Sequence, residues 1–246
     1  PNVVIIYADD LGYGDPSCYG SKFIKTPNID KLCKGGLKFS NGYCAAPTCT
    51  PSRYSLLTGE SPFRNKRARI LPGTASMIIS TTQSTIATVL RSAGYTTGVV
   101  GKWHLGLGDG KAPINWNKPI TQTPNDIGFD ESYIMAATND RVPCVYVKDK
   151  GVVGLDPNDP ILVSYKKNFP GEPTGKANPE LLTKMKHSHG HSQSIVNGIG
   201  RIGYMKGGTK ARWVDEDMAD IFTAQAVDFV TRKAKEDKPF FLFFAL

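Results

Sequence analysis

An unbroken apolar run at the start of the chain limits the fold more than any other feature. Residues 3–8 (VVIIYA) carry no charged side chain, and two aspartates follow them directly. A strand that is apolar at successive positions is typical of a parallel sheet with both faces buried. Residues 240–246 (FFLFFAL) have the same character. The sequence therefore predicts an α/β fold around a mostly parallel central sheet flanked by helices.

Helical patterns alternate with strand patterns along most of the chain. We expect helices over residues 27–35, 51–58, 84–94 and 214–237, and further strands over 37–43 and 96–103. Thr26 and Pro27 are a typical helix start, and Gly35 and Gly36 a typical helix end. Alternation of this kind indicates parallel strands joined by helices.

The composition changes between residues 109 and 210, where Gly, Pro, Asn and Lys dominate. A hairpin is expected over residues 143–155, turning at KDKG, and a long polar loop over 167–180. Loops on a rigid scaffold often carry binding residues. We therefore expect one domain with a loop-rich substrate-recognition insertion at about 109–210.

Charge and cysteine content argue against several classes of protein. The formal net charge is +8, but Lys and Arg are scattered and not interleaved with stacking aromatics, so no nucleic-acid partner is expected. We expect a solvated basic surface that could steer anionic ligands, and the alternative is a dedicated polyanion site. No apolar run is long enough to span a bilayer. The cysteines number five, without a CxxC pair, which argues against a zinc site and a closed disulfide framework.

Asp9 and Asp10 follow the first expected strand, at the edge where open α/β sheets bind ligands. Adjacent carboxylates repel each other, so a site that keeps both ionised favours a hard divalent cation such as calcium or magnesium. The alternative is that Asp10 only caps a turn before Gly12 and Gly14.

Cys49 lies just before the helix expected from Pro51. The unpaired backbone N–H groups of a helix N-terminus favour a thiolate, and equally a bound oxyanion. Arg53 adds a fixed fork of donors that can grip sulfate or phosphate. The alternatives for Cys49 are a buried packing thiol, a metal ligand or half of a disulfide.

Lys102 and His104 lie at the end of the strand expected over residues 96–103. Residues i and i+2 of an extended segment face the same side, so an ammonium and an imidazole group should converge. Such a pair suits charge neutralisation and proton transfer to a leaving oxygen. The alternative is an exposed lysine beside a hydrogen-bonded histidine.

Three motifs together resemble the type I, formylglycine-dependent sulfatase family of the alkaline-phosphatase superfamily. They are ADDLGYGD, then CTPSR continuing as YSLLTG, and then GYTTGVVGKWH, in the family's order and approximate spacing. The resemblance implies an alkaline-phosphatase-like fold and the hydrolysis of sulfate esters. It also implies that residues 1–246 are the N-terminal part of a sulfatase catalytic domain.

The resemblance assigns a modified nucleophile and a metal to the chain. Cys49 would be oxidised to formylglycine by a formylglycine-generating enzyme that recognises Pro51 and Arg53. One hydroxyl of the hydrated aldehyde would attack sulfur, and loss of a proton from the other would expel sulfate. Asp9 and Asp10 match two ligands of the family's calcium ion, which binds a sulfate oxygen.

The remaining implied roles concern the substrate, a sulfated carbohydrate. Arg53 would hold the nucleophile, Lys102 would neutralise the sulfate, and His104 would orient or deprotonate the nucleophile. The insertion would bind sulfated galactose or N-acetylgalactosamine, as in bacterial carbohydrate sulfatases, through Thr138, Asp140, Arg141 and His191.

Further family motifs are expected after a strand like residues 239–246 and are absent from this chain, so we expect a longer polypeptide. They are an HxPH-like motif, an Asp-Asn pair and a lysine. A periplasmic or secreted location is expected, with a signal peptide removed. Two rival functions stay open: a phosphonate or phosphate monoester hydrolase of the same superfamily, and a non-catalytic protein that binds sulfated glycans.

Overall fold

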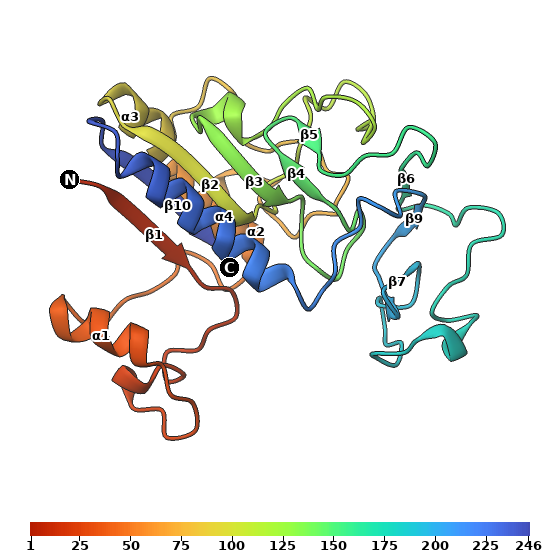
Figure 1. Ribbon diagram of the computed structural model, residues 1–246, viewed down its shortest axis with the longest axis horizontal. Helices are drawn as coiled ribbons and strands as arrows, with labels where there is room; N and C mark the ends of the chain where they lie inside the picture. Colours follow the sequence, from red (N-terminus) through yellow and green to blue (C-terminus); the bar gives the residue numbers. More distant parts are fainter.

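A six-stranded sheet forms the centre of the computed structural model, which describes residues 1–246 (Figure 1). Its strands, in spatial order, are β1 (Val3–Tyr7), β10 (Phe240–Ala245), β2 (Thr96–Lys102), β3 (Glu131–Met135), β4 (Tyr146–Lys148) and β5 (Gly151–Val152). The first four are parallel to one another, and β4 and β5 extend the sheet as an antiparallel hairpin. The expected mostly parallel sheet and the expected hairpin are both confirmed.

Helices cover both faces of this sheet. The helices of the chain are α1 (Pro27–Gly35), α2 (Cys49–Thr58), α3 (Ile86–Ser92) and α4 (Met218–Lys233), with 3-10 turns η1 (Ser17–Tyr19), η2 (Pro62–Arg64), η3 (Pro124–Ile127) and η4 (Pro179–Leu181). Of these helices, α1 lies away from the sheet and packs on η1 (Figure 1). In Figure 1, α4 passes in front of the sheet, whereas α2 and α3 lie behind it. No helix combines the length and the apolar character needed to cross a membrane.

The face of α4 that packs on the sheet follows from its sequence. Met218, Phe222, Ala226 and Phe229 recur at helical spacing and are all buried. Phe229 meets Phe240 of β10 edge-on, with the ring centroids 5.9 Å apart. Aromatic pairs in this geometry stabilise a core beyond the area that they bury.

The core also fixes the end of β2. Trp103, directly after β2, is fully buried, and its indole N–H donates to Gly106 O at 2.8 Å. Its ring meets Phe129 edge-on at 6.3 Å, and Phe129 stacks on Phe241 at 6.2 Å. Because Trp103 is anchored in this way, the residues on either side of it are held at the carboxyl edge of the sheet.

Three sequence expectations about secondary structure were wrong in part. β1 is not buried on both faces, because it lies at the edge of the sheet and leaves Val4 46% and Ile6 58% exposed. Residues 37–43 form no strand, since no neighbouring strand pairs with them. α2 begins at Cys49 instead of Pro51, because Thr48 takes the extended N-cap position.

Residues 109–210, called the excursion below, include two small antiparallel sheets. One pairs β6 (Leu162–Ser164) with β9 (Tyr204–Lys206), and the other pairs β7 (Ile195–Val196) with β8 (Ile199–Gly200). Arg201 follows β8, is almost fully buried, and pairs with Asp215 at 2.6 Å. Arg201 also donates to Asn139 O at 2.7 Å, which ties the segment after β8 to the loop after β3.

Candidate active site

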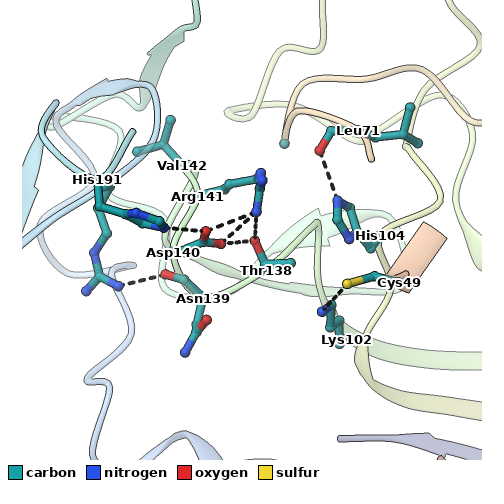
Figure 2. A network of polar contacts seen from close by, with 12 residues as sticks. Cys49, Leu71, Lys102, His104, Thr138, Asn139, Asp140, Arg141, Val142 and His191 are labelled. Carbon is teal, nitrogen blue, oxygen red and sulfur yellow. Dashed lines mark hydrogen bonds and ion pairs between the residues drawn. The ribbon is translucent and has the colours of Figure 1, made fainter. Parts of the chain in front are cut away.

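Cys49 is the first residue of α2 and faces Lys102 at the end of β2. Its Sγ lies 3.1 Å from Lys102 Nζ (Figure 2). The first turn of α2 is closed by the bond from Ser52 N–H to Thr48 O at 3.2 Å. An ammonium group and a helix N-terminus both stabilise negative charge, so this position suits an anion or a nucleophile.

Asp9 connects Lys102 to a second cation, Arg53. Its Oδ2 accepts a hydrogen bond from Lys102 Nζ, and its Oδ1 lies 3.4 Å from Arg53 Nη2. Desolvation by itself would raise the pKa of Asp9, but the hydrogen bond and charge of Lys102, together with Arg53, hold it below its ordinary value. Asp9 is therefore a carboxylate at neutral pH.

Arg53 is buried and does not line the pocket that lies at the end of β1. The side chain is fully buried, and Nη1 donates to Lys102 O at 2.7 Å. The guanidinium lies over the ring of Tyr7, 5.3 Å from its centroid, and Nε has no partner. Desolvation lowers the pKa of Arg53, although the charge of Asp9 acts in the opposite direction. Arg53 thus helps to position Lys102 through its backbone carbonyl and Asp9 through its carboxylate.

His104 is buried with one ring nitrogen engaged and the other free. Its Nε2 lies 2.9 Å from Leu71 O, and because a carbonyl only accepts, Nε2 carries the proton. Nδ1 is left as a buried acceptor without a partner. Desolvation lowers the pKa of His104 to about 4; the bond to Leu71 opposes this, and the charges of Lys102, Arg141 and Arg53 add to it.

The backbone at His104 is not that of a simple strand. Its φ is 56°, in the left-handed region, so the alternation expected from Lys102 to His104 ends at Trp103. His104 N–H donates to Ala136 O at 3.2 Å, which keeps this residue beside the end of β3. The two side chains are placed by these contacts and by Leu71, not by strand geometry alone.

A pocket of about 180 Å³ lies at the end of β1 and is lined by Asp9, Asp10, Cys44 and Cys49. Carboxylate oxygens are suitable donors for calcium, and Asp9 and Asp10 are adjacent here. The chain gathers no group of three or more His, Cys, Asp or Glu side chains able to hold a metal. The two aspartates therefore fit calcium in their donor chemistry, and no third His, Cys, Asp or Glu side chain is grouped with them.

A second polar cluster follows β3, near His104 (Figure 2). Asp140 is its centre: Oδ2 lies 2.9 Å from His191 Nε2, and Oδ1 lies 2.8 Å from Arg141 Nη1. Thr138 donates to Asp140 and accepts from Arg141 at 2.7 Å. Desolvation acts to raise the pKa of Asp140, but Thr138, His191 and Arg141 hold it below its ordinary value. All four residues expected to bind substrate thus lie together.

Two supporting residues were not found from the sequence. The Tyr7 hydroxyl lies 2.5 Å from Ser52 Oγ, and the Tyr7 ring packs against the Arg53 guanidinium. Tyr7 ends the apolar strand that precedes the aspartates, and this position could have marked it as a site residue. Arg201 holds the carbonyl of Asn139, directly before Asp140, and no motif marks it.

The chain is similar in sequence and in structure to known sulfatases. An N-acetylgalactosamine-6-O-sulfatase of Bacteroides thetaiotaomicron is 51% identical over 243 residues, covering 99% of this chain and 47% of that protein. A solved structure from work on glycosaminoglycan metabolism by Bacteroides thetaiotaomicron is 50% identical, with a TM-score of 0.96 over 100% of this chain and 50% of that one. The chain therefore spans about half the length of these relatives.

A more distant solved structure and a family model extend the comparison. Ps i-CgsB in complex with k-i-k-neocarrahexaose is 30% identical, with a TM-score of 0.62 over 100% of this chain and 44% of that one. The family model described as Sulfatase matches residues 1–246. The resemblance carried by the motifs around Asp9, Cys49 and Lys102 is thereby confirmed, as is the alkaline-phosphatase-like α/β fold, and the chain belongs to the sulfatase family.

Proposed function

We propose that the protein carrying this chain hydrolyses a sulfate ester of a carbohydrate. The observation that carries the proposal is the double contact of Lys102 Nζ, which touches both Cys49 Sγ and Asp9 Oδ2. A cation fixed in this way neutralises an anionic group brought against position 49. Arg53 and the N-terminus of α2 add positive potential on the same side.

Formylglycine at position 49 completes the proposed site. The Cys49 Sγ stands in for an oxygen of the modified side chain. The hydrated aldehyde supplies a hydroxyl nucleophile toward sulfur. Lys102 would hold the charge of the sulfate, and His104 Nδ1, an acceptor without a partner, would orient or take a hydroxyl proton at position 49.

Calcium would be held in part by Asp9 and Asp10. Bound there, it would withdraw negative charge from a sulfate oxygen. The ionised state of Asp9, held by Lys102 and Arg53, suits it as a hard oxygen ligand.

The maturation partner would be a formylglycine-generating enzyme that recognises Pro51 and Arg53. Arg53 is fully buried in the folded chain, so this enzyme must act before α2 packs against the sheet.

The proposed location of the protein is the periplasm or the outside of the cell.

The proposed substrate is a sulfated galactose or N-acetylgalactosamine. The 51% identical relative carries the name N-acetylgalactosamine-6-O-sulfatase. Asp140, Arg141 and His191 form a hydrogen-bonding cluster near His104 that suits sugar hydroxyls and acidic groups. The excursion over residues 109–210 would act as the substrate-recognition insertion.

A trial of matched esters tests the reaction. The full-length protein, matured in a host with a formylglycine-generating enzyme, would receive the sulfate and the phosphate ester of one alcohol. We expect the larger kcat/KM with the sulfate ester. A larger kcat/KM with the phosphate ester would instead support the phosphate or phosphonate monoester hydrolase.

The net charge of +8 favours a second candidate, a non-catalytic protein that binds sulfated glycans. The matched variant is Cys49→Ala, which removes the proposed nucleophile and leaves the surface charge unchanged. Sulfatase action predicts that this variant binds sulfated sugar without turnover, while the matured wild type turns it over. Binding without turnover by both proteins would support the second candidate.

A further inference from the structure

Two cysteines outside the candidate active site lie on elements that pack against each other. Cys18 belongs to η1 and Cys33 to α1, and both thiols are partly exposed. No sequence motif pairs them, because they are separated by 15 positions and belong to no spaced pattern. Their proximity follows from how η1 packs on α1.

Polar contacts on both sides of Cys18 hold η1 against α1. Ser17 Oγ donates to Asp30 Oδ2 at 2.7 Å, and Ser17 N–H donates to Thr26 Oγ1 at 2.9 Å. Lys38 Nζ donates to Cys18 O at 3.1 Å. These bonds fix the backbone of residue 18 over the side of α1 that carries Asp30.

Cys33 lies on that same side of α1. Residues three apart on a helix are surface neighbours, so Cys33 follows Asp30 along one face. Desolvation, the Cys33 thiol and the Asp30 charge raise the pKa of Cys18. The hydrogen bonds of η1 therefore place residue 18 beside Asp30, one helical turn from Cys33, and the effect of Cys33 on the Cys18 thiol agrees with this placement.

The segment that carries these thiols has almost no core of its own. Among residues 1–49, only Pro16 is buried, and α1 buries none of its residues. In Figure 1, the segment with α1 projects from the rest of the molecule. A small unit without a core is commonly held by covalent cross-links when it is exposed to oxidising conditions.

We propose that Cys18 and Cys33 form a disulfide bond. The oxidant is a disulfide, either oxidised glutathione or a protein thiol-disulfide oxidoreductase. One cysteine thiolate attacks the donor disulfide and releases a thiol, and the second thiolate then displaces the other half of the donor. The two cysteines lose two protons and two electrons, and the donor disulfide becomes two thiols.

The cross-link would hold the connection between Asp10 and Cys49. A bond from residue 18 to residue 33 restrains the unfolded states of this connection more than its native state. It leaves Cys44, Cys49 and Cys144 outside the pair, so the odd number of cysteines is no obstacle. The inference is independent of the proposed sulfatase activity, and its failure would leave that activity untouched.

Peptide mapping of the intact protein tests the bond. The protein is incubated with oxidised glutathione, its free thiols are alkylated under denaturing conditions, and it is digested with trypsin without reductant. We expect the peptide that ends at Lys22 to be joined to residues 32–34 and to separate on reduction. Alkylated Cys18 and Cys33, or a bond from Cys18 to Cys44, would overturn the proposal.

Two serine variants provide the control. Cys33→Ser should remove the joined peptide, whereas Cys44→Ser should leave it. Limited trypsin digestion supplies a readout that depends on the folded segment: cleavage after Lys31 should be at least about tenfold slower in oxidised than in reduced wild type. Cys33→Ser should show no such redox difference, and a wild type that shows none either would contradict the restraint.

Discussion

Cys49 and His104 show how single side chains acquire their roles from neighbours. Cys49 gains its setting from the first turn of α2 and from the ammonium of Lys102 at 3.1 Å. His104 gains a defined tautomer from Leu71 O, which leaves Nδ1 as a buried acceptor. A base can take up a proton only in its neutral form. Burial lowers the pKa of His104, so the ring stays neutral at pH values well below its ordinary pKa.

The depressed pKa of His104 predicts a loss of stability in mild acid. In the unfolded chain His104 takes up a proton below about pH 6.5, but in the folded chain only near a pKa of about 4. Between these values the unfolded state binds more protons, so the stability that neutral His104 contributes is lost as the pH falls. We expect about 2 kcal/mol less contribution at pH 5 than at pH 7.

Urea unfolding of wild type and His104→Asn at both pH values measures this effect. Asparagine does not titrate, so the variant should lose less stability on acidification than the wild type does. Equal losses in the two proteins would show that His104 does not titrate in this way.

At the scale of elements, the close contact of β2 with β10 positions the site. Gly101, directly before Lys102, has φ of 106° and lies against Ala245 of β10. A Cβ built on Gly101 would come within 1.8 Å of Ala245 O. Only glycine allows this approach, which brings β2 close to β10 and places Lys102, the last residue of β2, beside Cys49.

Gly101→Ala is therefore expected to destabilise the protein strongly. The added methyl group meets backbone, which cannot rotate away, and the positive φ adds strain, so a loss of about 3 kcal/mol or more is expected. Gly35→Ala is the matched control, because a Cβ there meets nothing within 4 Å. Chemical unfolding compares the two, and equal stability of both variants would contradict this role of Gly101.

At the scale of the whole molecule, local sequence predicted what depends on local pattern. The alternation of apolar strands and capped helices predicted the parallel sheet, and the motifs predicted Asp9, Cys49 and Lys102. Strand β3 was missed because Glu131 and Ser132 interrupt its apolar pattern. The strand expected over residues 37–43 was wrong, because strand propensity cannot show that a pairing strand is missing.

Contacts between distant segments were beyond the sequence. His191 could be named as a candidate from its loop, but its bond to Asp140 crosses 51 positions. Arg201 and Asp215, which hold the excursion near this pair, belong to no motif. Tertiary packing alone brings these residues together, so their contacts could not be predicted from a single sequence.

The link between the excursion and the sheet predicts a binding defect. His191→Ala removes one hydrogen-bond partner of Asp140, and we expect KM for a sulfated N-acetylgalactosamine to rise about tenfold with a smaller change in kcat. His187→Ala removes a nearby histidine that has no such bond. Steady-state kinetics of both variants checks this; equal KM values would argue against a role of His191 in recognition.

The mass of the peptide that contains Cys49 tests the central claim most directly. Trypsin releases residues 39–53, which carry both Cys44 and Cys49. In protein from its native source, we predict an aldehyde at position 49 and an alkylatable thiol at position 44. An unmodified thiol at position 49, in a host that converts the cysteine of another sulfatase, would contradict the proposed mechanism.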